Sequence, residues 1–284
     1  MDNVTHLSKK RLDEIYEEDW GQEELVEPDI TSYTEAYTQK RIHESAYNPI
    51  IAELRRKKKG NVLDIGTGNG INVFKLNEGM GFDEHYKFYG IDISASAARK
   101  LNKIAKLWGR NNLKFMQGDA ENLKFKDAVF DCTIQTEVLE HLPHPQRSIN
   151  EMFRVIKPGG LCVITTPNEQ HPLRKVVPSG YRKQVQAAQS SWAHRYDNHP
   201  EYFKDRHALH ISVQSKWELK EKLEKAGFEE IRFIRQPLFF GGRFYDKHPF
   251  LFAFTLFVDK VLDLLSAITW SHNFVVLSKK PRNP

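Results

Sequence analysis

The chain has 284 residues, which is enough for one large hydrophobic core or for one core with a substantial cap. With 40% hydrophobic and 28% charged residues, and without repeats or low-complexity tracts, its composition is that of an ordinary folded protein and excludes a fibrous or disordered chain. The formal net charge of +5 is unevenly spread, because residues 1–30 hold ten acidic and three basic side chains. This balance permits an anionic partner without indicating nucleic acid or lipid.

Apolar runs alternate with helical patterns along most of the chain. Strands are expected at residues 61–65, 86–92, 113–117, 129–136, 160–166, 228–235 and 273–279. Helices are expected at residues 69–79, 95–108, 145–156 and 215–226. Lys157-Pro158-Gly159-Gly160 is expected to end one helix and to turn the chain into the next strand. Strands that alternate with helices predict an α/β fold with a doubly wound, mostly parallel sheet of seven strands.

Three segments lie outside this alternation and divide the chain into a domain with additions. Residues 1–58 look helical and are expected to form an N-terminal helical cap on a single domain, residues 59–284. Residues 168–213 form a polar, aromatic and histidine-rich insertion, which we interpret as a lid. Residues 236–272 form a second insertion with an apolar helical pattern. Both insertions are helical caps on one core and not independent domains.

Two cysteines and the N-terminus bear on the compartment. Cys132 and Cys162 each fall in a predicted strand, so we expect buried thiols in a reducing compartment and not a disulfide or a metal pair. The first residues, Met-Asp-Asn-Val-Thr-His, show no basic segment followed by an apolar stretch, so no secretory signal is expected. These features favour a cytoplasmic location.

The most informative pattern is a glycine turn followed by a lone acid. Residues 62–70 read Val-Leu-Asp-Ile-Gly-Thr-Gly-Asn-Gly, and a second apolar run ends at Asp92. Glycines let a ligand approach the main chain closely, and an acid at the tip of the next strand can accept hydrogen bonds from both ribose hydroxyls. A dinucleotide-binding turn would need a glycine at position 71, where the chain has Ile71. The pattern therefore predicts a nucleoside site and disfavours a nicotinamide cofactor.

With Asp64 in front, the string D-x-G-x-G-x-G resembles the first motif of the class I S-adenosylmethionine-dependent methyltransferases. Residues 115–121 resemble the adenine-binding turn of that family, and residues 130–136 resemble its fourth strand, whose end contacts the methionine part of the cofactor. The resemblance covers residues 60–167 and resumes at 207–235 and 273–279. It implies S-adenosylmethionine as cofactor, held by Asp64, Gly66, Thr67, Gly68, Asp92, Ile93, Asp119, Ala120 and Thr136.

A further motif narrows the branch of the family. Glu137-Val138-Leu139-Glu140-His141, with the later Thr165-Thr166-Pro167-Asn168, resembles the small-molecule branch that includes ubiquinone-type O-methyltransferases. Methyl transfer needs in-line positioning, exclusion of water and, for a hydroxyl or amine, removal of one proton. His141 is the first candidate for this base because an imidazole titrates near neutral pH. His171 is the second candidate, and a purely structural role is the alternative for His141.

The same string also resembles the metal site of small-RNA 3′-end methyltransferases. Carboxylates and an imidazole on one short turn could hold a divalent cation, with ligands from Glu137, Glu140, His141 and either His207 or His210. A metal is not favoured, because metal-free relatives share the string. RNA-end methylation stays an alternative, although nucleic acid is not the expected partner, since no basic and aromatic single-strand platform stands out. A non-catalytic cofactor-binding regulatory protein is the third interpretation.

Residues 250–268 form an apolar helical pattern with a narrow polar stripe. Asp259, Lys260 and Asp263 interrupt the pattern too soon for a membrane span. The segment is therefore interpreted either as a cap helix buried on the core or in a dimer, or as an interfacial helix in peripheral contact with a membrane. Few cations line its polar stripe, which argues against lipid.

The sequence as a whole predicts an enzyme that transfers a methyl group by SN2 displacement to an oxygen, nitrogen or carbon nucleophile. The acceptor is expected to be a small molecule, lipophilic or anionic, bound between His141, the lid and the N-terminal tyrosines, Tyr33, Tyr37 and Tyr47. The basic and aromatic residues of the lid favour an anionic acceptor, while a solvated loop is the alternative. The oligomeric state is left open.

Overall fold

The computed structural model describes residues 33–168, 170, 212–238, 243–265, 270–271 and 273–282. Within these residues the strands are β1 (Gly60–Ile65), β2 (Tyr86–Asp92), β3 (Leu113–Gln117), β4 (Phe130–Thr136), β5 (Ile156–Pro167), β6 (Glu229–Arg235) and β7 (Asn273–Lys279). The helices described are α2 (Tyr33–Lys57), α3 (Ile71–Gly79), α4 (Ala95–Leu107), α5 (Pro145–Val155), α10 (Lys216–Ala226), α11 (Arg243–Lys247), α12 (Pro249–Leu264) and the 3-10 turn η1 (Leu139–His141).

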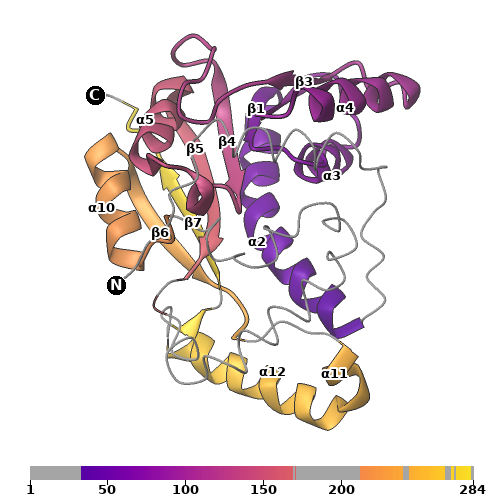
Figure 1. Cartoon of the computed structure of the whole chain (residues 1–284), viewed down its shortest axis with the longest axis vertical. Coiled ribbons are helices and arrows are strands. Elements are labelled where there is room, and N and C mark those ends of the chain that lie inside the picture. The colour runs from indigo at the N-terminus through magenta and orange to yellow at the C-terminus, as the bar shows by residue number, and fades with distance from the viewer. Residues whose placement is uncertain are drawn as a thin grey trace, which may run out of the picture.

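The strands form one sheet in the order β3-β2-β1-β4-β5-β7-β6 (Figure 1). Neighbours from β3 to β5 are parallel, and β7 runs antiparallel to both β5 and β6. The predicted α/β fold with a seven-stranded, mostly parallel sheet is confirmed. The strand order reverses between β1 and β4, and in open parallel sheets ligands bind outside the carboxyl ends of the strands at such a point.

Helices cover both faces of this sheet (Figure 1). On one face, apolar side chains of α2, α3 and α4 share a core with Val62 of β1. On the other face, those of α5 and α10 share a core with Leu63 and Ile65. Successive side chains of a strand point to opposite faces. Asp64 therefore points to the α2 face, as Val62 does.

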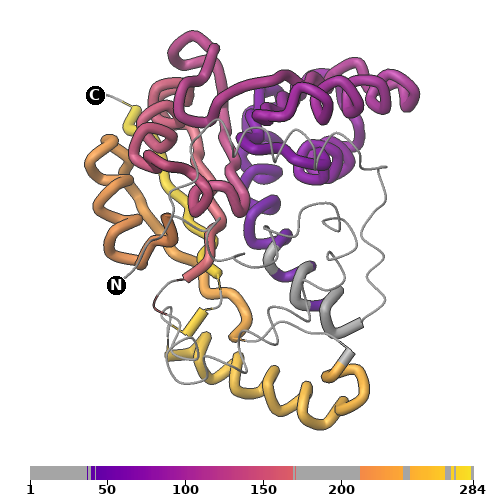
Figure 2. Tube along the Cα trace, in the orientation of Figure 1, coloured from indigo at the N-terminus to yellow at the C-terminus, as the bar shows by residue number. Residues whose placement is uncertain are grey.

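Helix α2 belongs to the core over its second half. Ile50 and Leu54 are fully buried in the same cluster as Val62. The second half of α2 runs alongside the sheet (Figure 2), and the helix extends beyond it and contacts α11 (Figure 1). The predicted helical character is observed in the described part, 33–57. The division into a cap at residues 1–58 and a domain at residues 59–284 stays a prediction, as does the lid at 168–213, most of which lies outside the described residues.

The start of β5 differs from the prediction. We expected a turn at residues 157–160 before the strand, whereas β5 follows α5 directly at Ile156. The pairing of β5 with β4 shifts in register there, and Gly159 has a φ of +73°. Lys157 Nζ lies 2.8 Å from Asp131 Oδ2, which keeps this segment next to β4. In place of the expected turn, the strand therefore has an irregularity.

The two cysteines are buried, as the sequence predicts. Cys132 and Cys162 are both buried and free. Burial raises the pKa of the Cys162 thiol to about 12 and also raises that of Cys132. Both thiols therefore stay protonated and serve as packing groups.

Helix α12 begins close to the predicted position, and residues 266–269 lie outside the described ones. Its polar side faces the protein, where Thr255 and Asp259 are buried, while Phe250 is 92% exposed. The interpretation of this helix as one whose apolar side is buried on the core is wrong. In the described part of the chain, none of the helices has both the length and the hydropathy needed to cross a membrane.

Replacing Leu54 by alanine tests whether α2 is part of the core. Leu54 is fully buried and packs on Gly60, where an added Cβ would lie 2.7 Å from Leu54 Cδ2. We expect Leu54→Ala to lower the free energy of unfolding in urea by about 2–5 kcal/mol, because it leaves a cavity. The control Leu107→Ala, at a side chain 78% exposed on α4, should change it by less than about 0.5 kcal/mol. Equal effects of the two variants would contradict this packing.

Candidate functional site

The glycine turn lies at the carboxyl end of β1, next to the point where the strand order reverses. The backbone N–H groups of Gly66 and Thr67 both donate to the Ile91 carbonyl of β2, at 2.8 Å each. Gly66 has a φ of +74°, and an added Cβ would lie 2.3 Å from Val138 Cγ2. The tight turn and the close approach of the next loop therefore require glycine at this position.

A buried carboxyl supports the turn from behind. Asp64 is fully buried, and its Oδ2 accepts a hydrogen bond from Thr67 Oγ1 at 2.7 Å. Its Oδ1 accepts one from Asn72 Nδ2 at 3.0 Å. The same Asn72 amide nitrogen lies 2.7 Å from Thr136 Oγ1, and Asn72 Oδ1 accepts from Tyr47 Oη at 2.6 Å. One network thus joins β1, the turn, α3, the end of β4 and α2.

The surroundings of Asp64 change its titration. Burial raises the pKa of Asp64 to about 7, and the nearby charge of Asp92 acts in the same direction. The hydrogen bonds from Thr67 and Asn72 oppose this rise without cancelling it. Burial also raises the pKa of Tyr47, and the charge of Asp64 adds to that effect. The carboxyl of Asp64 consequently takes up a proton close to neutral pH.

Asp92 lies at the tip of β2, as the sequence predicts. Its Oδ2 accepts a hydrogen bond from the backbone N–H of Gly68 at 2.8 Å, and its Oδ1 accepts one from that of Ser94 at 3.0 Å. The carboxylate therefore ties the glycine turn of β1 to the start of α4. Beside it, the Ile93 carbonyl accepts a hydrogen bond from Gln117 Nε2 at 3.1 Å.

The predicted adenine-binding turn follows β3, the neighbour of β2. The register pairs Asp92 with Gln117, so Asp119 and Ala120 come just beyond the same edge of the sheet. Asp119 Oδ1 accepts the Glu121 N–H at 2.8 Å and thereby closes its own turn. The turns that carry Asp92 and Asp119 thus lie side by side, next to the glycine turn.

The two carboxylates of the E-x-x-E-H string diverge. Glu137 Oε1 accepts a hydrogen bond from Thr165 Oγ1 at 2.9 Å, whereas the buried Glu140 accepts from Thr166 Oγ1 at 3.1 Å. Thr165 and Thr166 are successive residues of β5, so their side chains point to opposite faces. The two carboxylates are therefore drawn apart.

His141 follows Glu140 on η1, and its Nε2 lies 4.0 Å from Glu140 Oε1. Its side chain is 22% exposed. Within the described ranges, no group of three or more His, Cys, Asp or Glu side chains is arranged to hold a metal ion. The geometry thus gives no support to joint metal binding by Glu137, Glu140 and His141. The other residues proposed for a metal or a base, His171, His207 and His210, lie outside the described residues.

Sequence reasoning missed the polar part of α2 and α3. Tyr47 was assigned to the acceptor side of the site and Asn72 was given no role, yet they form the buried network behind the turn. His43 stacks on Tyr47, with ring centroids 5.3 Å apart, and burial lowers the pKa of His43 with a further contribution from Lys75. The spacing of His43 and Tyr47 at i and i+4 places both on one helix face, a signal that was present in the sequence.

The titration of Asp64 predicts how stability depends on pH. The carboxyl has a pKa of 3.8 in a model compound and about 7 in the fold, so between these values the folded chain binds more protons than the unfolded chain. As the pH rises through this window, the titration of Asp64 lowers the free energy of unfolding by up to about 1.4 kcal/mol per pH unit. Asp64→Asn removes the contribution. Urea unfolding measured from about pH 4 to pH 7 should show that the wild type loses stability relative to the variant as the pH rises. Parallel plots of unfolding free energy against pH would contradict the raised pKa of Asp64.

Comparison with known proteins and the geometry of the glycine turn both indicate a methyltransferase. A family model described as a methyltransferase domain matches residues 56–236. The ubiquinone/menaquinone biosynthesis C-methyltransferase UbiE of Brucella anthropi is 33% identical over 116 residues, which are 40% of this chain and 44% of the relative. Norajmaline N-methyltransferase of Rauvolfia serpentina is 36% identical over 109 residues, 38% of this chain and 36% of the relative.

A third relative is the phthiotriol/phenolphthiotriol dimycocerosates methyltransferase of Mycobacterium leprae, 30% identical over 158 residues, 55% of this chain and 54% of the relative. The chain thus matches less than two thirds of the length of each of these relatives.

Two solved structures share the fold. One, a Galdieria sulphuraria protein assigned as a sarcosine dimethylglycine methyltransferase, has a TM-score of 0.59 at 16% identity and covers 95% of this chain and 98% of its own. The other is phosphoethanolamine N-methyltransferase 2 of Haemonchus contortus in complex with S-adenosyl-L-methionine, with a TM-score of 0.53 at 17% identity, covering 83% of this chain and 53% of its own. Because the family model spans more than half of the chain, the chain belongs to the class I S-adenosylmethionine-dependent methyltransferase family.

Proposed function

We propose that this protein is an S-adenosylmethionine-dependent methyltransferase that acts on a small molecule. The observation that carries the proposal is the turn formed by Gly66 and Gly68 beside Asp92, in a chain of this family. The residues fit the cofactor, because the turn excludes a Cβ at Gly66 and a carboxylate stands at the end of β2, where a ribose needs an acceptor. The residues that would hold it are Asp64 through the turn, Gly66, Thr67, Gly68, Asp92, Ile93, Asp119, Ala120 and Thr136.

When bound, S-adenosylmethionine supplies a methyl group that its sulfonium has already activated. The chain then needs to fix the acceptor, exclude water and hold one proton. We assign the proton to His141, because it lies on η1 just beyond the carboxyl end of β4 and its ring lies beside Glu140. Glu140 is buried and bound by Thr166 Oγ1, so it can orient the imidazole.

The acceptor that we propose is a small molecule, lipophilic or anionic. The names of the relatives support a small acceptor but differ in the atom methylated, since one is a C-methyltransferase and another an N-methyltransferase. As expected from the sequence, the proposal keeps oxygen, nitrogen and carbon as the possible nucleophiles of this acceptor. The proposal includes a cytoplasmic location, which the two buried free thiols support. It also includes a lid at residues 168–213, as expected from its aromatic and basic composition.

Removal of the Asp92 carboxylate tests the cofactor site. We expect Asp92→Ala to weaken the binding of S-adenosylmethionine by about 2–4 kcal/mol, because charge-assisted hydrogen bonds to the ribose are lost. Isothermal titration calorimetry measures the affinity. Asp92 also binds the Gly68 N–H, so Asp92→Asn, which keeps an acceptor oxygen for that N–H, reports how much of the loss comes from the turn.

A matched control for this experiment is Glu224→Ala, at an acid on α10 whose side chain is 54% exposed. It should leave the affinity for the cofactor unchanged. Unchanged affinity in Asp92→Ala would mean that the carboxylate does not face the ribose.

Removal of the His141 imidazole tests the proposed base. We expect His141→Ala to lower turnover by about 10²–10⁴-fold with little change in cofactor affinity, because general base catalysis contributes in that range. The assay follows formation of S-adenosylhomocysteine with a panel of small phenols, hydroquinones and amines. His141→Gln keeps much of the volume and serves as the control for packing. Wild-type turnover in both variants would remove His141 from the reaction.

A further inference from the structure

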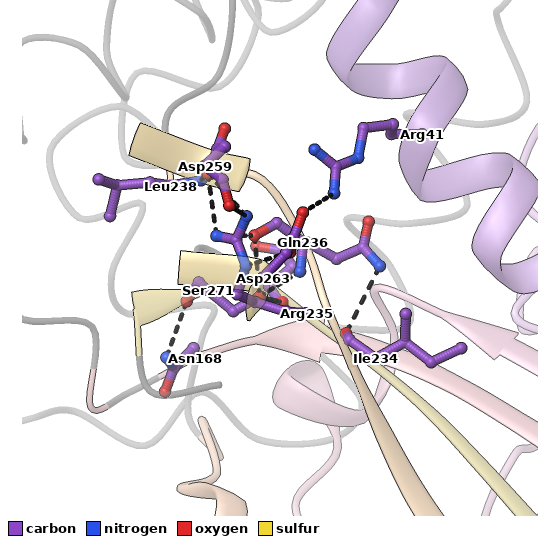
Figure 3. Close-up of polar contacts among 10 residues, drawn as sticks. Arg41, Asn168, Ile234, Arg235, Gln236, Leu238, Asp259, Asp263 and Ser271 are labelled. Carbon is purple, nitrogen blue, oxygen red and sulfur yellow. Dashed lines mark hydrogen bonds and ion pairs between the residues drawn. The ribbon is translucent and has the colours of Figure 1, made fainter. Parts of the chain in front are cut away.

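Helix α12 is attached to the protein through its acidic side (Figure 3). Arg235, at the end of β6, donates from Nη1 and Nη2 to Asp259 Oδ1 at 2.9 Å each and from Nε to Asp263 Oδ1 at 2.6 Å. The side chains of Arg235 and Asp259 are 4% and 3% exposed. Arg41 of α2 donates to Asp263 Oδ2 at 3.1 Å. Both acids of the polar stripe are therefore neutralised by arginines of the protein body.

The opposite side of α12 is apolar and faces outward. Residues on it follow helical spacing and are 38–92% exposed: Phe250, Phe254, Phe257, Val261, Leu264 and Leu265. A surface helix of a globular protein normally turns its apolar stripe to the core and its charges to water. Here the arrangement is reversed. An amphipathic helix whose apolar side covers no core is a candidate site of interaction.

Two lysines lie at the border of this face. Lys260 is exposed on one flank of α12, and Lys247 is exposed just before its first turn. Of the acids of the helix, Asp259 is buried, and Asp263, which is 40% exposed, is paired with both Arg235 and Arg41. From the sequence alone, the small number of cations on the polar stripe argued against lipid. In the fold that stripe faces the protein, so the cations that can meet a lipid surface are the lysines at the border of the outer face. Apolar side chains with cations at their flank match an anionic lipid surface.

The size of the face disfavours a second copy of the chain as occupant. Sixteen residues make a helix about 24 Å long and about 10 Å wide, so its outer side offers about 240 Å². A stable dimer buries about 800 Å² on each partner. A single helix can nevertheless bind a membrane surface by burying its apolar side in the boundary between headgroups and acyl chains.

We propose that the outer face of α12 docks on an anionic lipid surface. The docking face lies at the carboxyl ends of the strands, as the candidate cofactor site does. Arg235, the last residue of β6, binds Asp259 of α12, and β6 runs parallel to β5 because both are antiparallel to β7. Docking would therefore bring the carboxyl edge of the sheet toward the membrane (Figure 1). The docking itself stands independently of the proposed methyl transfer, and it adds a route by which a lipophilic acceptor could arrive.

Flotation with lipid vesicles tests this proposal on the full chain. Vesicles of phosphatidylcholine alone are compared with vesicles that also contain phosphatidylglycerol. We expect the wild type to float with the anionic vesicles, and the double variant Phe254→Ser/Phe257→Ser to bind them at least about tenfold more weakly, because two exposed aromatic side chains lose their place in the lipid. Lys260→Glu should weaken binding to the anionic vesicles by about fivefold or more.

The matched control is Leu107→Ser on α4, an apolar side chain that is 78% exposed away from α12. It should bind within about twofold of the wild type. A wild type that does not float, or a control that loses as much binding as the double variant, would overturn the proposal. Light scattering adds a second criterion. A wild-type dimer that the double variant separates into monomers would assign the face to a second copy of the chain. A wild type that is already a monomer would exclude that occupant.

Calorimetry with S-adenosylmethionine keeps the two proposals apart. Because α12 carries none of the cofactor residues, the double variant should bind the cofactor as the wild type does. Normal cofactor affinity without vesicle binding in the wild type would overturn the docking alone. Vesicle binding without cofactor affinity would leave the docking in place and overturn the proposed enzyme.

Discussion

The burial of one carboxyl group, that of Asp64, constrains the arrangement around the candidate site. A carboxyl without water must find hydrogen-bond donors within the protein. Thr67 and Asn72 provide them, and Asn72 is in turn bound by Tyr47. These side chains come from the turn, α3 and α2. The hydrogen bonds that start from the single carboxyl of Asp64 therefore hold these three elements against β1. The glycine turn is held in place from behind, which leaves its outer side for a ligand.

The same rule explains the unusual orientation of α12. Arg235 is buried at the end of β6 and needs a negative partner. Asp259 and Asp263 supply it only if the polar stripe of α12 turns inward. The apolar residues on the other side of the helix must then face outward. The pairing of the buried Arg235 with these two acids thus leaves an apolar surface exposed, although the hydrophobic pattern alone would place that surface inside.

This contrast shows what can be predicted from the sequence. Strands, the turn of Gly66 and the position of Asp92 follow from local patterns of apolar residues, glycines and acids, and the structure agrees with them. The contact between Tyr47 and Asn72 joins residues 25 positions apart, and that between Arg235 and Asp259 joins residues 24 positions apart. Periodicity identifies the helices that carry these residues but does not say which side of a helix meets which strand. Partners at such separations therefore had to come from the fold.

The E-x-x-E-H string illustrates the same limit within a motif. On a regular helix, Glu137, Glu140 and His141 would lie on one side, as a metal site requires. The backbone at Glu137 has a φ of +52°, and only the residues from Leu139 to His141 form a 3-10 turn. This break lets the two carboxylates reach successive threonines of β5 on its opposite faces. A single left-handed residue thus separates one potential cation site into two supports, of which the buried Glu140 stays beside the imidazole of His141.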